Sequence, residues 1–107
     1  MAKFEKGIIF EPQAVTDYAE GSVVSRELLH NDAGSITVFS FDEGQGLSEH
    51  QAPYDALVQV LDGQMHFILE GTNLTITEGQ ALVIPAGARH AVKADKPFKM
   101  MITMIKG

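Results

Sequence analysis

The chain has 107 residues, of which 45% are hydrophobic and 21% charged, with a net charge of -6 and no cysteine. This is the composition of one globular domain. The lack of cysteine excludes disulfides, thiolate nucleophiles and Cys-ligated zinc. The acidic balance and the scattered basic residues argue against nucleic-acid binding. With no apolar run near the roughly 18 residues of a membrane span and no signal-peptide pattern, we expect a cytoplasmic protein without a membrane partner.

The predicted strands begin after an N-terminal arm, residues 1–21. Residues 12–24 have some helical character, which Gly21 and the β-branched pair after it limit to about two turns. Short apolar runs then follow at 22–30, 35–41, 56–61, 65–70, 74–77, 81–85, 90–94 and 98–105. They are rich in Val, Ile, Phe and Thr and are separated by Gly, Asp, Asn and Pro, which is typical of strands and turns. We therefore predict a single all-β domain over residues 1–107, with its barrel core at about 22–105.

Two connections bear on the topology. Asp62-Gly63 lies between two apolar runs and predicts a hairpin, because Gly accepts the positive φ that tight hairpin turns require. The residues from Gly44 to Tyr54 contain no apolar run. They are expected to form a loop that leads into the strand at 56–61.

Several of the predicted strands are apolar on both faces. In the run 56–61, Ala56, Val58 and Val60 share one face, while Leu57 and Leu61 lie on the other. The run 98–105 repeats this pattern. A small sandwich fills only one inner face, so the second face needs cover. We expect a second copy of the chain to provide it in a homodimer; the alternative is cover by termini or loops of the same chain.

Two patterns of glycine and histidine lie between residues 44 and 94. In the first, His50 follows Gly44 after five residues and Gly63 closes the segment; in the second, GQALVIPAGARHAVKA, the fixed residues are Gly79, Pro85, Gly87 and His90. These residues and spacings resemble the two motifs of the cupin family. The resemblance implies a double-stranded β-helix, or jelly-roll barrel, in which inward residues of the two motifs share one cavity.

The chain departs from the family pattern at three positions. Ala52 stands where the first motif has its second His, Ala56 where it has Glu, and Ala94 where the second motif has Asn. Cupin metal sites typically use three His and one Glu, so the resemblance leaves only His50 and His90. Catalytic zinc takes three protein ligands, and non-heme iron commonly two His and one carboxylate. We therefore expect a divalent metal ion (Zn, Ni, Fe or Mn) to be weakly held or absent.

A third ligand could come from Asp55 or Gln59. A one-residue shift at the start of the strand would turn Asp55 inward; otherwise it is a solvated acid. Gln59 has the parity opposite to Ala56 and is expected to face away from the cavity or into a dimer contact. His66 is expected on the surface or in an interface, and His30 in an exposed turn.

The expected cavity is apolar. By alternation, its inward residues are Val58, Val60, Met65, Phe67, Leu82 and Ile84, with Met100, Ile102 and Met104 from the last run. Such a lining suits a small, partly apolar ligand held by two imidazoles, although the same side chains could simply fill the barrel. Small-molecule binding is the first expected function. The alternatives are a metal-dependent enzyme of dioxygenase or isomerase type, metal-free acid–base catalysis by His50 or His90, and a structural dimeric module. The sequence assigns neither a substrate nor catalytic residues.

Overall fold

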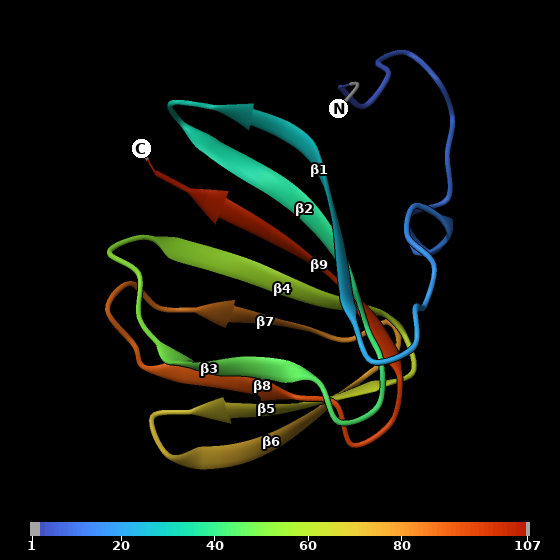
Figure 1. The fold of residues 1–107 in the computed structure, drawn as a ribbon. Coiled ribbons are helices and arrows are strands. Elements are labelled where there is room, and N and C mark those ends of the chain that lie inside the picture. Colours follow the sequence, from blue (N-terminus) through green and yellow to red (C-terminus); the bar gives the residue numbers. More distant parts are fainter. Residues whose placement is uncertain (1–2, 107) are drawn as a thin grey trace.

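The computed structural model describes residues 3–106 and shows an all-β chain with one short 3-10 helix, η1 (Pro12–Ala14) (Figure 1). Its strands are β1 (Val23–Asn31), β2 (Gly34–Phe41), β3 (Gly46–His50), β4 (Asp55–Asp62), β5 (Gln64–Leu69), β6 (Thr72–Thr77), β7 (Ala81–Ile84), β8 (His90–Lys93) and β9 (Phe98–Ile105). Among the described residues, no helix is long and apolar enough to cross a membrane.

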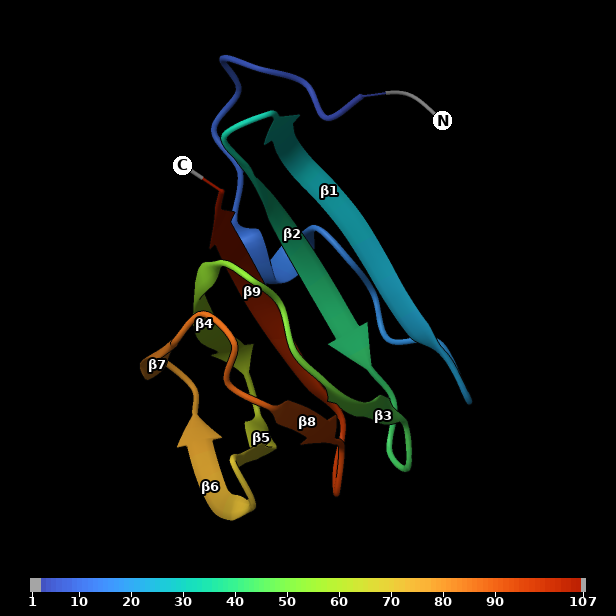
Figure 2. The same cartoon turned by 90° about the vertical axis from the view of Figure 1, so that its left-hand side faces the viewer.

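The strands form two antiparallel sheets that pack face to face. One sheet has the order β1-β2-β9-β4-β7, and the other has the order β3-β8-β5-β6. Figure 2 shows the first sheet running diagonally from β7 to β1, above the strands of the second. The predicted all-β jelly-roll fold is confirmed.

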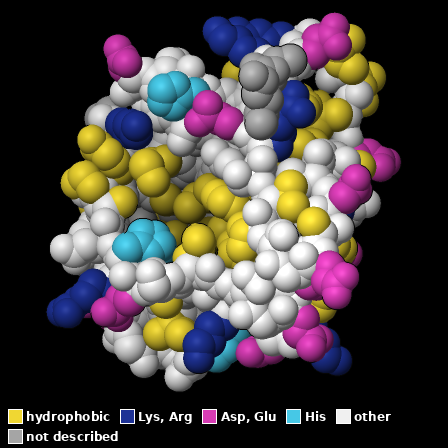
Figure 3. Space-filling model, in the orientation of Figure 1, with side chains coloured by type: hydrophobic (Ala, Val, Ile, Leu, Met, Phe, Trp, Pro, Cys, Tyr) yellow, Lys and Arg dark blue, Asp and Glu magenta, His cyan; other side chains and the backbone are white. Residues whose placement is uncertain are grey.

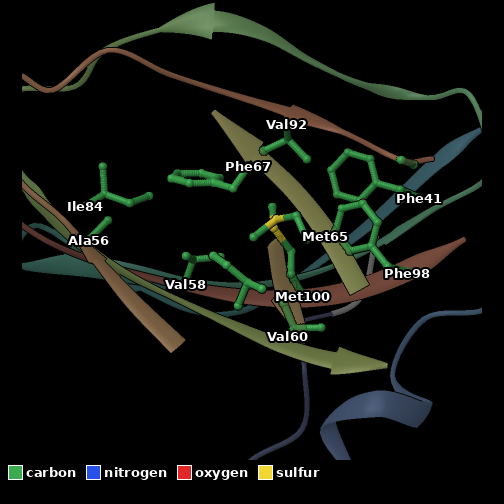
Figure 4. Close-up of a cluster of buried hydrophobic side chains, with 12 residues drawn as sticks. Phe41, Ala56, Val58, Val60, Met65, Phe67, Ile84, Val92, Phe98 and Met100 are labelled. Carbon is green, nitrogen blue, oxygen red and sulfur yellow. The ribbon is translucent and has the colours of Figure 1, made fainter. Parts of the chain in front are cut away.

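One hydrophobic cluster fills the space between the sheets (Figure 4). It follows from strand alternation, because Ala56, Val58 and Val60 of β4 are buried while the residues between them are only half-buried. Phe41 and Phe98 stack at its core, with ring centroids 4.7 Å apart. The buried members are Phe41, Ala56, Val58, Val60, Met65, Phe67, Ile76, Ile84, Val92, Ala94, Phe98 and Met100.

The hairpin predicted at Asp62-Gly63 is wrong. β4 pairs with β7 and β9, whereas β5 pairs with β6 and β8, so the chain passes from one sheet to the other at Gly63. Gly63 has φ 72°, and a Cβ there would lie 2.7 Å from the carbonyl oxygen of Pro97. Gly63 is therefore required because the chain passes close to Pro97 as it crosses between the sheets. A hairpin turn would also require glycine here, so the local sequence does not distinguish the two structures.

Two further local predictions need correction. Residues 46–50, expected in a loop, form β3, whose polar sequence GLSEH lacks an apolar run because only one of its residues, Leu47, packs against the core. The segment of helical character is limited to the three residues of η1, which begins with Pro12. In both places, pairing or contact with the rest of the molecule decides the local structure.

Hydrogen bonds hold the segment after η1 against the outer face of the five-stranded sheet. The Thr16 hydroxyl lies 2.5 Å from that of Ser40, and the Lys99 ammonium donates to the Thr16 carbonyl oxygen at 2.6 Å. The Tyr18 hydroxyl donates to Asp62 at 2.5 Å. Partial burial and this bond to a carboxylate raise the pKa of Tyr18 above its usual value.

Candidate functional site

His50 and His90 meet in the four-stranded sheet. His50 is the last residue of β3, His90 is the first of β8, and the two are cross-strand partners in the antiparallel ladder. Their ring centroids lie 4.2 Å apart, with the planes inclined by 60°. The structure therefore places the histidines of the two sequence motifs in direct contact.

Each ring is oriented by a hydrogen bond to its own backbone. The Nδ1 of His50 lies 2.8 Å from the carbonyl oxygen of Ser48, and the Nδ1 of His90 lies 3.0 Å from that of Ala88. A carbonyl oxygen only accepts, so Nδ1 is the donor in both rings. In a neutral imidazole this leaves Nε2 with a free lone pair, the arrangement usual for histidines that bind metals or accept hydrogen bonds from ligands.

The two rings differ in exposure. His90 is only 7% exposed and stacks on Phe67, with ring centroids 5.8 Å apart and planes inclined by 27°. His50 is exposed. The pair therefore extends from the hydrophobic core to the surface, with His90 as the inner ring and His50 as the outer one.

The turn of the second motif is tied to the end of the first. The backbone amide of Gly87, at φ 80°, donates to the carbonyl oxygen of Ala52 at 2.7 Å. The amide of Ala86 donates to Asp55 Oδ1 at 2.8 Å. These bonds hold the strand ends that carry the histidines, and they give the Asp55 carboxylate a partner in the turn.

The structure does not bring the candidate third ligands to the pair. β4 keeps an unbroken register from Asp55 to Val60, so Asp55 and Gln59 share the outward parity and Ala56 the inward one. His66 lies on the outer face, with Nδ1 3.2 Å from Asp95 Oδ2. Within residues 3–106 no group of three or more His, Cys, Asp or Glu side chains could hold a metal ion.

The apolar residues predicted to line the pocket point into the barrel. Val58, Val60, Met65, Phe67 and Ile84 are all buried, and Leu82 packs partly buried against them. They fill the interior and do not form an open lining, because they pack together in one hydrophobic cluster. Figure 4 shows the five buried ones. Figure 3 shows a hollow on the face seen there, lined by hydrophobic side chains and with a histidine beside it.

Sequence reasoning missed the polar residues around His50. A shallow pocket there is lined by Glu49, His50, Gln51 and Arg89. Arg89 lies beside Glu70, whose carboxylate accepts a hydrogen bond from the Arg89 backbone amide. Glu49 and Gln51 flank His50 in the sequence, and Arg89 precedes His90. Assigning 46–50 to a strand paired with the one that His90 begins would have indicated these three residues.

Comparisons with known proteins agree with the fold. The cupin domain family matches residues 37–106. A conserved protein of unknown function from Streptococcus pyogenes is 30% identical, with a TM-score of 0.91 over 100% of this chain and 96% of that one. A cupin 2 conserved barrel domain protein from Leptotrichia buccalis is 39% identical, with a TM-score of 0.84 over 86% of this chain and 45% of that one.

More distant structures share the fold alone. A DMSP lyase from Ruegeria pomeroyi is 22% identical, with a TM-score of 0.70 over 78% of this chain and 46% of that one. No curated protein matches the sequence.

Proposed function

The chain belongs to the cupin family, and we propose that it binds a small, partly apolar molecule, or weakly a divalent metal ion, through His50 and His90. The observation that carries this proposal is the contact of the two rings, each with its Nδ1 held by a backbone carbonyl. Both Nε2 atoms are thereby left to accept a hydrogen bond or to donate a lone pair to a metal.

The donor set does not fit a full cupin metal centre. Two imidazoles are one ligand short of the three that a catalytic zinc takes, and Ala52 and Ala56 offer no donor atom. Solvent or a bound molecule would have to supply most of the coordination shell. We therefore expect weak affinity for Zn²⁺, Ni²⁺, Fe²⁺ or Mn²⁺ and derive no reaction step through a metal.

The chemistry of the ligand follows from the polar and apolar groups at the histidine pair. The Nε2 atoms favour a molecule with hydroxyl or amino donors, and the partly buried Leu69, the cross-strand partner of His90 in β5, offers an apolar contact. Exposure of His50 allows entry from solvent. A small molecule with a polar head and a short apolar part meets both requirements.

The proposal is tested by thermal-shift screening of a metabolite panel and by calorimetric titration with the four metal ions. Hits should be lost in His50→Ala and in His90→Ala and kept in His66→Ala. His66 is a matched control because it lies on the outer face and bonds to Asp95 instead. If ligand responses persist in both site variants, the histidine pair is not the binding site.

A metal-free acid–base role for His50 is the second candidate. Its exposed ring, oriented by the Ser48 carbonyl, could accept a proton at Nε2 from a bound substrate. Chemical conversion of a bound hit that resists chelator and is abolished by His50→Gln would favour this role. A hit that binds and is recovered unchanged would favour the binding protein.

A further inference from the structure

The pocket at His50 contains a cation that the binding of a neutral molecule would leave unused. Arg89 lines this pocket together with Glu49, His50 and Gln51, and its volume of about 400 Å³ suits a small molecule. Arg89 immediately precedes His90 in the sequence, so the cation and the inner ring lie on consecutive residues. The pocket therefore joins the histidine pair to a guanidinium group.

The backbone of Arg89 is held by Glu70 on both sides. The amide of Arg89 donates to Glu70 Oε2, and the Arg89 carbonyl oxygen accepts from the Glu70 amide at 2.8 Å. Glu70 lies in the tight turn between β5 and β6 and has φ 47°, although Gly, Asn and Asp are the residues that such a turn favours. The bond from Arg89 to the Glu70 side chain is thus an interaction that the turn itself does not require.

The guanidinium of Arg89 remains open to a ligand. Its Nε lies 4.0 Å from Glu70 Oε2, which is too far for a hydrogen bond, and the side chain is 66% exposed. Within residues 3–106 the guanidinium makes no hydrogen bond to the protein. Its paired N–H groups match the two oxygens of a carboxylate, which they bind in a planar, two-point contact.

The charges around Arg89 favour an anion with a single charge. Glu49 lines the same pocket, and Glu70 lies beside the guanidinium. Two carboxylates near one cation oppose a phosphate group, which carries nearly two negative charges at neutral pH. A carboxylate carries one charge and is opposed less strongly.

We propose that the ligand of the histidine pair is a short hydroxy acid, whose carboxylate binds Arg89 and whose hydroxyl donates to Nε2 of His50 or His90. This inference rests on the proposed binding function of the two histidines. Their Nε2 lone pairs accept the hydroxyl proton, because Nδ1 is already committed to a backbone carbonyl in each ring. Leu69, the cross-strand partner of His90, contacts the apolar part of the acid.

The experiment is calorimetric titration at neutral pH with lactate, mandelate and phenyllactate, each compared with its own primary amide. The amide keeps the hydroxyl and the carbon skeleton and lacks the charge. At least one acid should bind about fivefold or more tightly than its amide. Arg89→Gln should abolish this preference and leave the affinity for the amide unchanged, because the histidines still accept the hydroxyl.

Lys93→Gln is the matched control, because it removes the same charge from an exposed position of β8. It should keep the preference for the acid. Failure of all three acids to bind more tightly than their amides, or a preference that survives Arg89→Gln, would overturn the proposal. An amide whose binding depends on His50 and His90, with no preference for the acid, would contradict this inference alone and leave the proposed function standing.

Discussion

The two strands that carry the histidines are unlike in sequence and in burial. β8 lies within the second motif, which departs from the family pattern only at Ala94, and its His90 is buried against Phe67. β3 belongs to a first motif that has Ala52 and Ala56 in place of ligands, and its His50 is exposed. His90 is therefore part of the hydrophobic core, whereas His50 is held mainly by the pairing of β3 with β8.

The largest expected effect concerns the inner histidine. His90→Ala removes a buried ring from Phe67 and should lower the free energy of unfolding by about 2 kcal/mol. His50→Ala at the exposed position should cost less than about 0.5 kcal/mol. Urea denaturation measures both values. Equal losses in the two variants would contradict the distinction between an inner and an outer ring.

The close approach of β3 to β8 depends on Gly46. A Cβ at this position would lie 2.3 Å from the carbonyl oxygen of Val92, a contact that requires the two strands to separate. Gly46→Ala should therefore destabilise the protein by about 2 kcal/mol and weaken ligand responses at the histidine pair.

Gly44→Ala is the control for this prediction. Gly44 has φ 84°, so the substitution strains the backbone, but its Cβ would meet no atom within 4 Å. If Gly44→Ala weakens ligand responses as much as Gly46→Ala, strand separation is not the cause.

The missing ligands of the first motif can be restored one at a time. Ala52→His would add a third imidazole beside His50, as the cupin motif has it, and should raise the affinity for Zn²⁺ by roughly tenfold or more. Calorimetric titration measures the change. Ala14→His, at an exposed position of η1, is the control and should leave the affinity unchanged. An Ala52→His variant with unaltered affinity would show that residue 52 does not face the pair.

The smallest effect concerns Tyr18, whose hydroxyl bonds the N-terminal segment to Asp62. Burial and Asp62 hold the folded pKa of Tyr18 above its unfolded value of about 10. Above that pH the unfolded chain loses a proton that the folded protein keeps, so stability should fall as pH rises. The fall should be shallower in Tyr18→Phe, and ligand responses at the histidines should be unchanged. Equal slopes in alkaline unfolding would contradict the assignment to Tyr18.

Much of the fold could be predicted from the sequence because its strands are apolar and alternate. The runs at 56–61 and 98–105 correspond to β4 and β9, which form the floor of the core. β3 was not predicted because its polar sequence contains no apolar run. It forms a strand through its pairing with β8. The passage from one sheet to the other at Gly63 was not predicted, because a glycine with positive φ suits a hairpin turn and a change of sheet equally well.

The site was predictable in part for a related reason. The spacing of the two motifs selected His50 and His90, which the structure brings into contact. Their common tautomer could not be predicted, because it depends on carbonyl groups that turn toward each ring only in the folded strands. The positions of Asp55 and Gln59 depended on a register that the sequence alone left open.

Nitrogen-15 NMR of the imidazole rings shows whether His50 and His90 form one shared site. We expect neutral His50 and His90 both to carry the proton on Nδ1, and their Nε2 resonances to shift together when Zn²⁺ or a screening hit is added. His66 should not follow them. A proton on Nε2 in either ring, or a response confined to one of the two histidines, would contradict a shared site.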